Sequence, residues 1–191
     1  MLRKLCLTIG CLSAALLSGC LSTTTFAPVN QWDGRFSLIA QSDQHKENQT
    51  GRFTLQLAPQ GDLVLDLKTA LGNTLARIEY ASEEVRLQAD GMKEVIGKNP
   101  EQLMNELLGF YVPLDGLAFW IDGALLPDAP AQTQPATAPY DTIDQLGWNI
   151  TYRQFDDSGL PRRIVFERKQ TPLSPALKIT LIILERRHGT P

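Results

Sequence analysis

The sequence contains few of the residues on which catalysis and metal binding usually depend. It has two histidines, His45 and His188, and three cysteines, Cys6, Cys11 and Cys20. Neither histidine lies in a metal-binding or triad pattern, and there is no Gly-x-Ser-x-Gly motif or convergent carboxylate motif. We therefore expect no catalytic residue, no metal site and no cofactor, and we interpret the chain as a non-enzymatic protein.

Nucleotide and nucleic-acid binding are also disfavoured. Residues Gly91 to Asn99 superficially resemble a phosphate loop, but the second glycine comes one position late and Asn99 replaces the Ser or Thr that binds magnesium. Without Arg3 and Lys4 the chain has 16 basic against 21 acidic residues, a formal charge of −5. Phosphate backbones require a concentrated basic surface, so we expect no nucleic-acid partner.

One local basic cluster is present near the C-terminus: Arg162, Arg163, Arg168 and Lys169. Such a cluster usually forms a solvated strand edge and turn. A weak attraction to anionic headgroups is the alternative interpretation.

The first twenty residues have the pattern of an export signal. Arg3 and Lys4 precede an uncharged apolar stretch from Leu5 to Leu17, which is shorter than the roughly 20 residues needed to span a bilayer. The segment Leu17-Ser18-Gly19-Cys20 resembles a lipobox, and the alternative is an ordinary signal peptide with an incidental cysteine. We predict that residues 1–19 are a lipoprotein signal peptide and that Cys20 is lipidated.

Cleavage would leave Cys20 as the one cysteine of the mature chain, so no disulfide can form within a monomer and core burial must hold the fold. Residues 20–31 are rich in Ser, Thr and Pro and predict a flexible, lipidated tether. Similarity to bacterial lipoproteins implies a sorting rule in which aspartate after the lipidated cysteine favours the inner membrane. Leu21 occupies that position, so we expect the periplasmic face of the outer membrane, with anchorage through Cys20.

From Trp32 onward, apolar residues alternate with polar ones, which is typical of half-buried antiparallel strands. The alternating sets are Trp32, Phe36, Leu38 and Ala40; Phe53, Leu55 and Leu57; Leu63, Leu65 and Leu67; Ala76, Ile78 and Tyr80; and Val85, Leu87 and Ala89. Residues 58–62 combine proline and glycine in a short segment and predict a hairpin turn.

The period then changes to that of helices. Asn99 can cap a helix that starts at Pro100 and ends at Gly109, and a second short apolar segment runs from Pro113 to Gly123. The proline-rich segment from Pro127 to Pro139 predicts a flexible surface excursion. Further strands follow at Trp148, Ile150 and Tyr152; Ile164 and Phe166; and Ile179, Leu181 and Ile183.

These patterns predict a mainly β (α+β) fold in which residues 32–191 form a single domain. We expect one antiparallel sheet of about 10–11 strands curled around two short helices, with closure of the curl left open. The abundant apolar material fits an ordinary filled core or a lipid cavity, and periodicity does not separate the two.

Four stretches, in order, resemble the LolB family: Trp32 to Ser37, Leu65 to Ile78, Leu107 to Gly123, and Gly147 to Tyr152 with Pro161 and Ile164 after it. They cover Trp32 to about Leu184. One position departs from the family pattern, because Ala70 replaces the proline common before the Leu-Gly of the second stretch.

The resemblance implies an incomplete antiparallel barrel with helices at its mouth, enclosing an apolar cavity for acyl chains. The cavity residues it suggests are Phe36, Leu38, Phe53, Leu55, Leu65, Leu67, Ile78, Leu103, Leu107, Trp120, Trp148 and Ile150. Leu71, with Ala70 and Gly72, matches a protruding loop that enters the bilayer. Turn chemistry at Gly72 and Asn73 predicts a sharp reversal with Leu71 at or near its tip. From the sequence alone the alternative is favoured in which Leu71 folds back onto the core, as a leucine inside a turn usually does.

The function that the resemblance implies is that of an outer-membrane receptor. Such a receptor accepts lipoproteins from the periplasmic carrier LolA and inserts them into the bilayer without ATP. Its expected partners are LolA, the lipoprotein cargo with its acyl chains, and outer-membrane phospholipid, and we expect a monomer. A lipid-binding or stress-sensing lipoprotein, an envelope scaffold and an enzyme are the competing hypotheses.

Overall fold

The computed structural model describes residues 29–81, 84–172 and 174–189. The predictions for the signal peptide, for Cys20 and for the tether up to residue 28 lie outside these described residues. Within them, no helix is long and apolar enough to cross a membrane.

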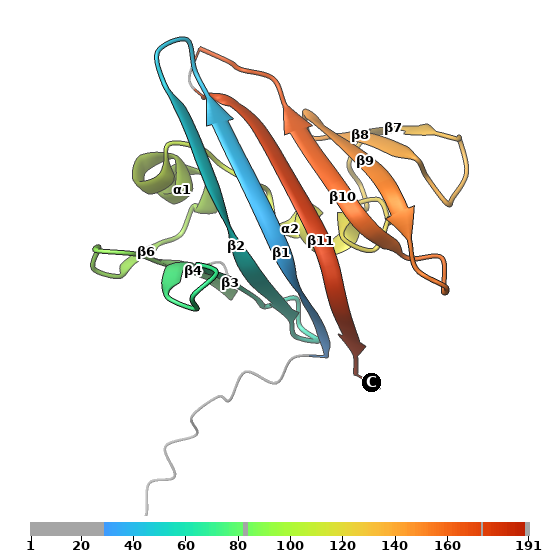
Figure 1. Ribbon diagram of the computed structural model, residues 1–191, viewed down its shortest axis with the longest axis horizontal. Coiled ribbons are helices and arrows are strands. Elements are labelled where there is room, and N and C mark those ends of the chain that lie inside the picture. The colour runs from blue at the N-terminus through green and yellow to red at the C-terminus, as the bar shows by residue number, and fades with distance from the viewer. Residues whose placement is uncertain (1–28, 82–83, 173, 190–191) are drawn as a thin grey trace, which may run out of the picture.

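The described residues form one eleven-stranded antiparallel sheet and two short helices (Figure 1). Six strands precede the helices: β1 (Asn30–Gln41), β2 (Lys46–Leu57), β3 (Leu63–Lys68), β4 (Thr74–Ala81), β5 (Glu84–Ala89) and β6 (Val95–Gly97). The helices are α1 (Pro100–Leu108) and α2 (Leu114–Trp120). Five strands follow: β7 (Ala131–Gln134), β8 (Thr142–Gln145), β9 (Trp148–Phe155), β10 (Pro161–Arg168) and β11 (Ala176–His188).

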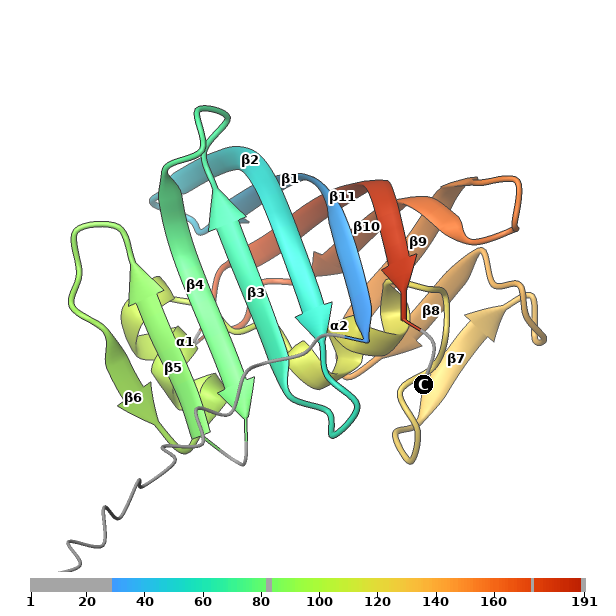
Figure 2. The same ribbon diagram turned by 90° about the horizontal axis from the view of Figure 1, so that it is seen from below.

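The sheet is open, because its order β6-β5-β4-β3-β2-β1-β11-β10-β9-β8-β7 leaves β6 and β7 as unjoined edges. It curves so that both helices lie on its inner side (Figure 2). This arrangement confirms the predicted mainly β fold with an incomplete antiparallel barrel around short helices.

The two ends of the domain meet in the middle of the sheet. β1 pairs with β11 from Asn30 opposite His188 to Gln41 opposite Ala176, with a bulge at Asp33 and Gly34. On its other side β1 pairs with β2 along its whole length. The first strand begins at Asn30, slightly before the predicted domain start at Trp32.

Helix α1 has the predicted boundaries. The Asn99 side chain accepts a hydrogen bond from the backbone N–H of Gln102 at 3.0 Å, and Pro100 occupies the first turn, where its missing N–H costs nothing. Gly109 ends the helix with φ 74°, a left-handed conformation that glycine adopts without strain. The predicted cap and stop are therefore confirmed.

Three short strands, β6, β7 and β8, were not predicted from the sequence. The prediction of a flexible excursion between Pro127 and Pro139 is wrong for its centre, because β7 lies there and pairs with β8. Proline is tolerated beside β7 because this strand forms an edge of the sheet. Strand β6 was also missed, since three residues are too few to show a period.

Candidate functional site

An apolar cavity of about 90 Å³ lies between the inner face of the sheet and the helices. Seven predicted residues line it: Phe36, Leu38, Phe53, Leu55, Leu65, Leu67 and Ile78. They come from β1, β2, β3 and β4, where alternation turns every second side chain inward. Every side chain around the cavity is apolar, so it offers dispersion contacts and no hydrogen-bond partner.

Nine lining residues were not among the predicted site residues: Met104, Leu108, Phe110, Val112, Leu117, Ile121, Phe166, Ile179 and Leu181. Two signals could have found some of them. Met104 and Leu108 are four positions apart and therefore share one face of α1. Ile179 and Leu181 continue the inward alternation of β11, the central neighbour of β1.

Five predicted cavity residues lie elsewhere in the core: Leu103, Leu107, Trp120, Trp148 and Ile150. Leu103 lies beside β6, where its Cδ1 would be 3.8 Å from a Cβ placed on Gly97. Trp120, Trp148 and Ile150 are buried between α2 and the β8–β9–β10 side of the sheet. These three side chains are buried there and do not border the cavity.

Two glycines shape the cavity wall at β1 and β2. A Cβ on Gly34 would lie 2.6 Å from the ring of Phe53, and one on Gly51 would lie 2.9 Å from the ring of Phe36. Real Cβ atoms do not approach so closely, so only glycine lets each aromatic ring lie against the neighbouring strand. Both rings line the cavity.

A buried amide anchors α2 to β8. Gln145 is 2% exposed, and its side-chain oxygen accepts hydrogen bonds from Trp120 Nε1 at 2.8 Å and from the Leu126 N–H at 3.0 Å. Its Nε2 donates to the carbonyl oxygens of Leu126 and Ala129. All the hydrogen-bonding capacity of the amide is used, as burial requires.

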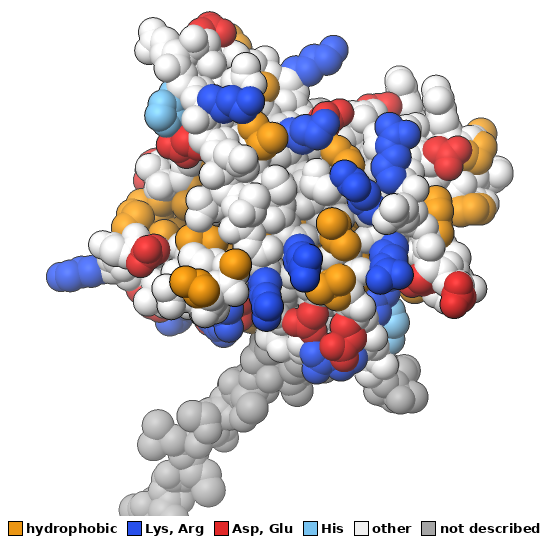
Figure 3. All heavy atoms as spheres, in the orientation of Figure 1, with side chains coloured by type: hydrophobic (Ala, Val, Ile, Leu, Met, Phe, Trp, Pro, Cys, Tyr) orange, Lys and Arg blue, Asp and Glu red, His pale blue; other side chains and the backbone are white. Residues whose placement is uncertain are grey.

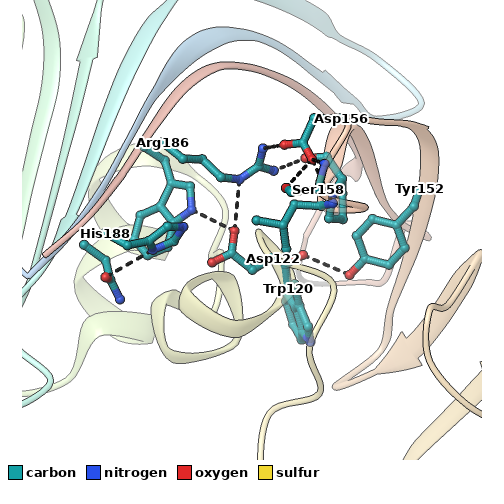
Figure 4. Close-up of polar contacts among 11 residues, drawn as sticks. Trp120, Asp122, Tyr152, Asp156, Ser158, Arg186 and His188 are labelled. Atoms are coloured by element: carbon teal, nitrogen blue, oxygen red, sulfur yellow. Dashed lines mark hydrogen bonds and ion pairs between the residues drawn. The ribbon is translucent and has the colours of Figure 1, made fainter. Parts of the chain in front are cut away.

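A polar cluster fixes the C-terminal end of α2 (Figure 4). The Asp122 carboxylate accepts hydrogen bonds from Trp32 Nε1 at 2.8 Å and from Arg186 Nε at 3.2 Å. Arg186 also pairs with Asp156 at 2.9 Å and donates to the Pro161 carbonyl. The cluster joins α2 to β1, β11 and the β9–β10 turn, so this end of the helix is held at several points.

The pKa values of Tyr152, Tyr111 and Asp156, which lie in or near the helices and the polar cluster, are shifted from their ordinary values. Burial, with the nearby Asp122 charge second, raises the pKa of Tyr152, whose hydroxyl donates to the Trp120 carbonyl at 2.9 Å. Burial, followed by the charges of Asp115 and Glu101, raises the pKa of Tyr111 to about 12. The hydrogen bond from the Ser158 hydroxyl is the largest of the effects that lower the pKa of Asp156.

The β3–β4 turn carries the second feature of the site. Leu71 at its tip is 91% exposed, and Ala70 and Gly72 are exposed beside it. Gly72 has φ 93°, and the Thr69 N–H donates to the Asn73 carbonyl at 2.8 Å to close the turn. The alternative in which Leu71 folds back onto the core is therefore wrong.

Exposure of this leucine is unusual for a large apolar side chain. Exposing it costs on the order of 2 kcal/mol relative to burial. The β3–β4 hairpin projects beyond the outer face of the neighbouring strands (Figure 2).

Among the residues the structure describes, no group of three or more His, Cys, Asp or Glu side chains is arranged to hold a metal ion.

Fold and cavity together define a class: β proteins whose curved antiparallel sheet surrounds an apolar interior. The family described as "Outer membrane lipoprotein LolB" matches residues 30–185. The chain therefore belongs to the LolB family of outer-membrane lipoproteins.

Curated relatives carry the same name, "Outer-membrane lipoprotein LolB". The protein from Cupriavidus metallidurans is 32% identical over 94% of this chain and 97% of its own length. That from Cupriavidus necator is 31% identical over 91% of this chain and 94% of its own. That from Ralstonia nicotianae is 29% identical over 83% and 79%.

The chain is also similar to a solved structure, the crystal structure of a LolA superfamily protein from Nitrosomonas europaea. The two share 10% sequence identity and superpose with a TM-score of 0.46, over 86% of this chain and 89% of the other.

Proposed function

We propose that this chain is a receptor anchored to the outer membrane through lipidated Cys20. It accepts lipoproteins from the periplasmic carrier LolA, holds their acyl chains in the apolar cavity and inserts them into the outer membrane without ATP. The observation that carries the proposal is the combination of a wholly apolar cavity with Leu71, a 91% exposed leucine on a projecting hairpin. Membership of the LolB family supports the same reading.

The cavity matches the chemistry of the cargo but not its size. Each buried methylene contributes about 0.8 kcal/mol, so a site that replaces water around an acyl chain must offer continuous apolar walls. At about 90 Å³ the cavity is smaller than the roughly 300–1,000 Å³ of typical ligand pockets. Cargo entry therefore requires that the walls separate.

The hydrogen bonds around α2 favour α1 as the part of the cavity wall that moves. Gln145, Tyr152 and Asp122 hold α2 and its C-terminal end to the sheet. Helix α1 and residues 109–113 contribute Met104, Leu108, Phe110 and Val112 to the cavity wall. In the proposed mechanism α1 moves outward with Met104 and Leu108. Helix α2 remains in place, as does Tyr111, whose carbonyl accepts a hydrogen bond from Arg168 of β10.

Release needs no nucleotide because the final step is downhill. Acyl chains that leave a small protein cavity for the bilayer gain a complete hydrocarbon environment. The exposed Leu71 would enter the membrane first and recover there the free energy that its exposure costs. In this scheme the partners are LolA, the lipoprotein cargo and phospholipid, and the receptor acts as a monomer.

Replacement of Leu71 by glutamate tests the proposal. Leu71→Glu should fold with an unchanged melting temperature and accept cargo from LolA, but insertion into liposomes should be lost and cargo-bound receptor should accumulate. Leu146→Glu is the matched control, since Leu146 is also an exposed leucine on a turn, 50% exposed between β8 and β9. Delivery by Leu71→Glu at the wild-type rate would refute the role of the hairpin.

A lipid-binding lipoprotein and an envelope scaffold on the same fold are the remaining alternatives. Copurified acyl chains in the cavity would separate either cavity function from the scaffold. Transfer of cargo from LolA to liposomes without ATP would distinguish the receptor from a simple lipid-binding protein.

A further inference from the structure

Four cations occupy one row across the outer face of the sheet. The pairing register places Lys68 of β3 opposite Arg52 of β2, and Arg52 opposite Arg35 of β1. Arg35 and Arg163 of β10 both lie opposite Ile182 of β11. We call Lys68, Arg52, Arg35 and Arg163 the cationic row; at about 4.8 Å per strand it spans roughly 19 Å.

The side chains of the cationic row are exposed and point away from the cavity. All four are exposed, and the residue after Arg35 and the residue after Arg52 line the cavity from the inner face. Side chains alternate between the two faces of a strand, so these arginines point outward.

No carboxylate neutralises the row. Within residues 29–81, 84–172 and 174–189, none of the four cations has an ion pair or side-chain hydrogen bond. Neighbouring acids are engaged by other cations: Asp66 by Arg77, Glu167 by Lys178 and Asp33 by Arg187.

This arrangement has a cost in the free protein. Like charges directly opposite on adjacent strands are destabilising, and Lys68, Arg52 and Arg35 form two such contacts in succession. The chain as a whole is acidic, with a formal charge of −3, so the local excess of positive charge runs against the composition. An anionic partner on this face would remove the repulsion.

The row lies on the face from which the Leu71 hairpin projects. Lys68 is the last residue of β3, and the turn that carries Leu71 follows it directly. In Figure 2 the β3–β4 hairpin rises above the outer face of β2, β1 and β11, and in Figure 3 that face displays Lys and Arg side chains over the central strands. A membrane surface that contacts the hairpin tip on this face would therefore also lie close to the cationic row.

We propose that the cationic row binds anionic phospholipid headgroups and holds the outer face of β2, β1, β11 and β10 towards the bilayer. In that orientation the β3–β4 hairpin points into the membrane. The orientation of the hairpin rests on the proposed function, in which Leu71 enters the membrane. Headgroup binding by the row stands on the register and charge alone.

Vesicle binding tests the row directly. The mature chain carrying Cys20→Ala, exported with a cleavable signal so that neither an acyl group nor the signal peptide holds it to the membrane, is mixed with vesicles. These contain phosphatidylcholine alone or phosphatidylcholine with an equal part of phosphatidylglycerol. Arg35→Gln/Arg52→Gln should bind the phosphatidylglycerol vesicles more weakly by about fivefold for each removed charge. Binding to phosphatidylcholine should not change, and added salt should abolish the difference.

A second pair of substitutions removes the same charge elsewhere. Lys93→Gln/Lys98→Gln lies outside the row, on exposed positions on either side of β6, and should leave vesicle binding near the wild-type value. The row variant should melt at or above the wild-type temperature because it loses a like-charge contact. This rules out misfolding as the cause of weaker binding.

Two results would overturn the proposal. In one, the row variant binds phosphatidylglycerol vesicles as wild type does, or the Lys93/Lys98 control loses as much affinity. In the other, the row variant keeps vesicle binding but no longer accepts cargo from LolA, which would make this face a protein-docking surface. Failure of the receptor function is detected separately, since Leu71→Glu would then deliver cargo normally while the row variant still loses vesicle affinity.

Discussion

The indole Nε1 of Trp120 donates a hydrogen bond at 2.8 Å to the side-chain oxygen of Gln145 in the interior of the protein. This contact connects α2 to β8, and three further hydrogen bonds from the same amide reach Leu126 and Ala129. One buried side chain therefore satisfies polar groups of α2 and of the segment that follows it.

Substitution of Gln145 by leucine should destabilise the protein by about 3 kcal/mol or more. The change leaves Trp120 Nε1 and backbone groups of Leu126 and Ala129 without partners, and each buried unsatisfied group costs about 1–3 kcal/mol. Urea unfolding measures the loss. Asn149→Ala removes an exposed hydrogen bond of the same hairpin and should cost far less; equal losses would contradict the role of Gln145.

A charge in the cavity wall should damage folding and cargo acceptance together. Phe53 is 3% exposed and lines the cavity, so Phe53→Asp would bury an unpaired carboxylate at a cost of several kcal/mol. Thermal melting and cargo uptake from LolA are the measurements. Thr50→Asp places the same charge on the outer side of β2 and should melt near the wild-type temperature; an unchanged melting temperature for Phe53→Asp would argue against the inward orientation.

Loss of the proposed lipid anchor should separate membrane attachment from cargo binding. Cys20→Ala, exported with a cleavable signal, should yield a soluble periplasmic protein that still accepts cargo, because the described sheet and cavity begin at Asn30. Delivery to membranes should slow without disappearing. A transfer assay with loaded LolA measures both steps, and failure to accept cargo in solution would show that tether and cavity are not independent.

The free energy of unfolding should fall at alkaline pH, because two tyrosine hydroxyls ionise more readily in the unfolded chain than in the folded protein. The pKa of Tyr152 and of Tyr111 is raised in the folded state, so their contribution to stability is complete below pH about 10, the unfolded pKa, and is lost as pH rises through the higher folded value. For Tyr111 that value is about 12.

Substitution of Tyr152 by phenylalanine should make this alkaline loss smaller. At neutral pH the variant should lose about 1 kcal/mol, because the Trp120 carbonyl loses its hydrogen bond. Urea unfolding at several pH values between about 9 and about 12 measures the slope. The same slope for wild type and Tyr152→Phe would show that Tyr152 does not ionise on unfolding in this range.

Short range patterns predicted most strands and the boundaries of α1. Alternation identified the inward residues of β1 to β4, since a strand with one buried face must present an apolar residue at every second position. Asn99, Pro100 and Gly109 marked α1 because the unsatisfied groups at helix ends are local requirements. The β8–β9 hairpin was missed at β8 because its turn is Leu146-Gly147, and leucine at φ 53° is not a recognised turn signal.

By itself, then, the sequence determined the longer strands, α1 and the inward faces of β1 to β4, because these follow from interactions between residues close together in the chain. Only the tertiary structure decided that Trp120, Trp148 and Ile150 fill one side of the half-barrel while Phe36 and Phe53 border a cavity. It likewise decided that the sheet stays open between β6 and β7 and that Leu71 stands in solvent. The cationic row exists only through the register of five strands, since its members are scattered from residue 35 to residue 163.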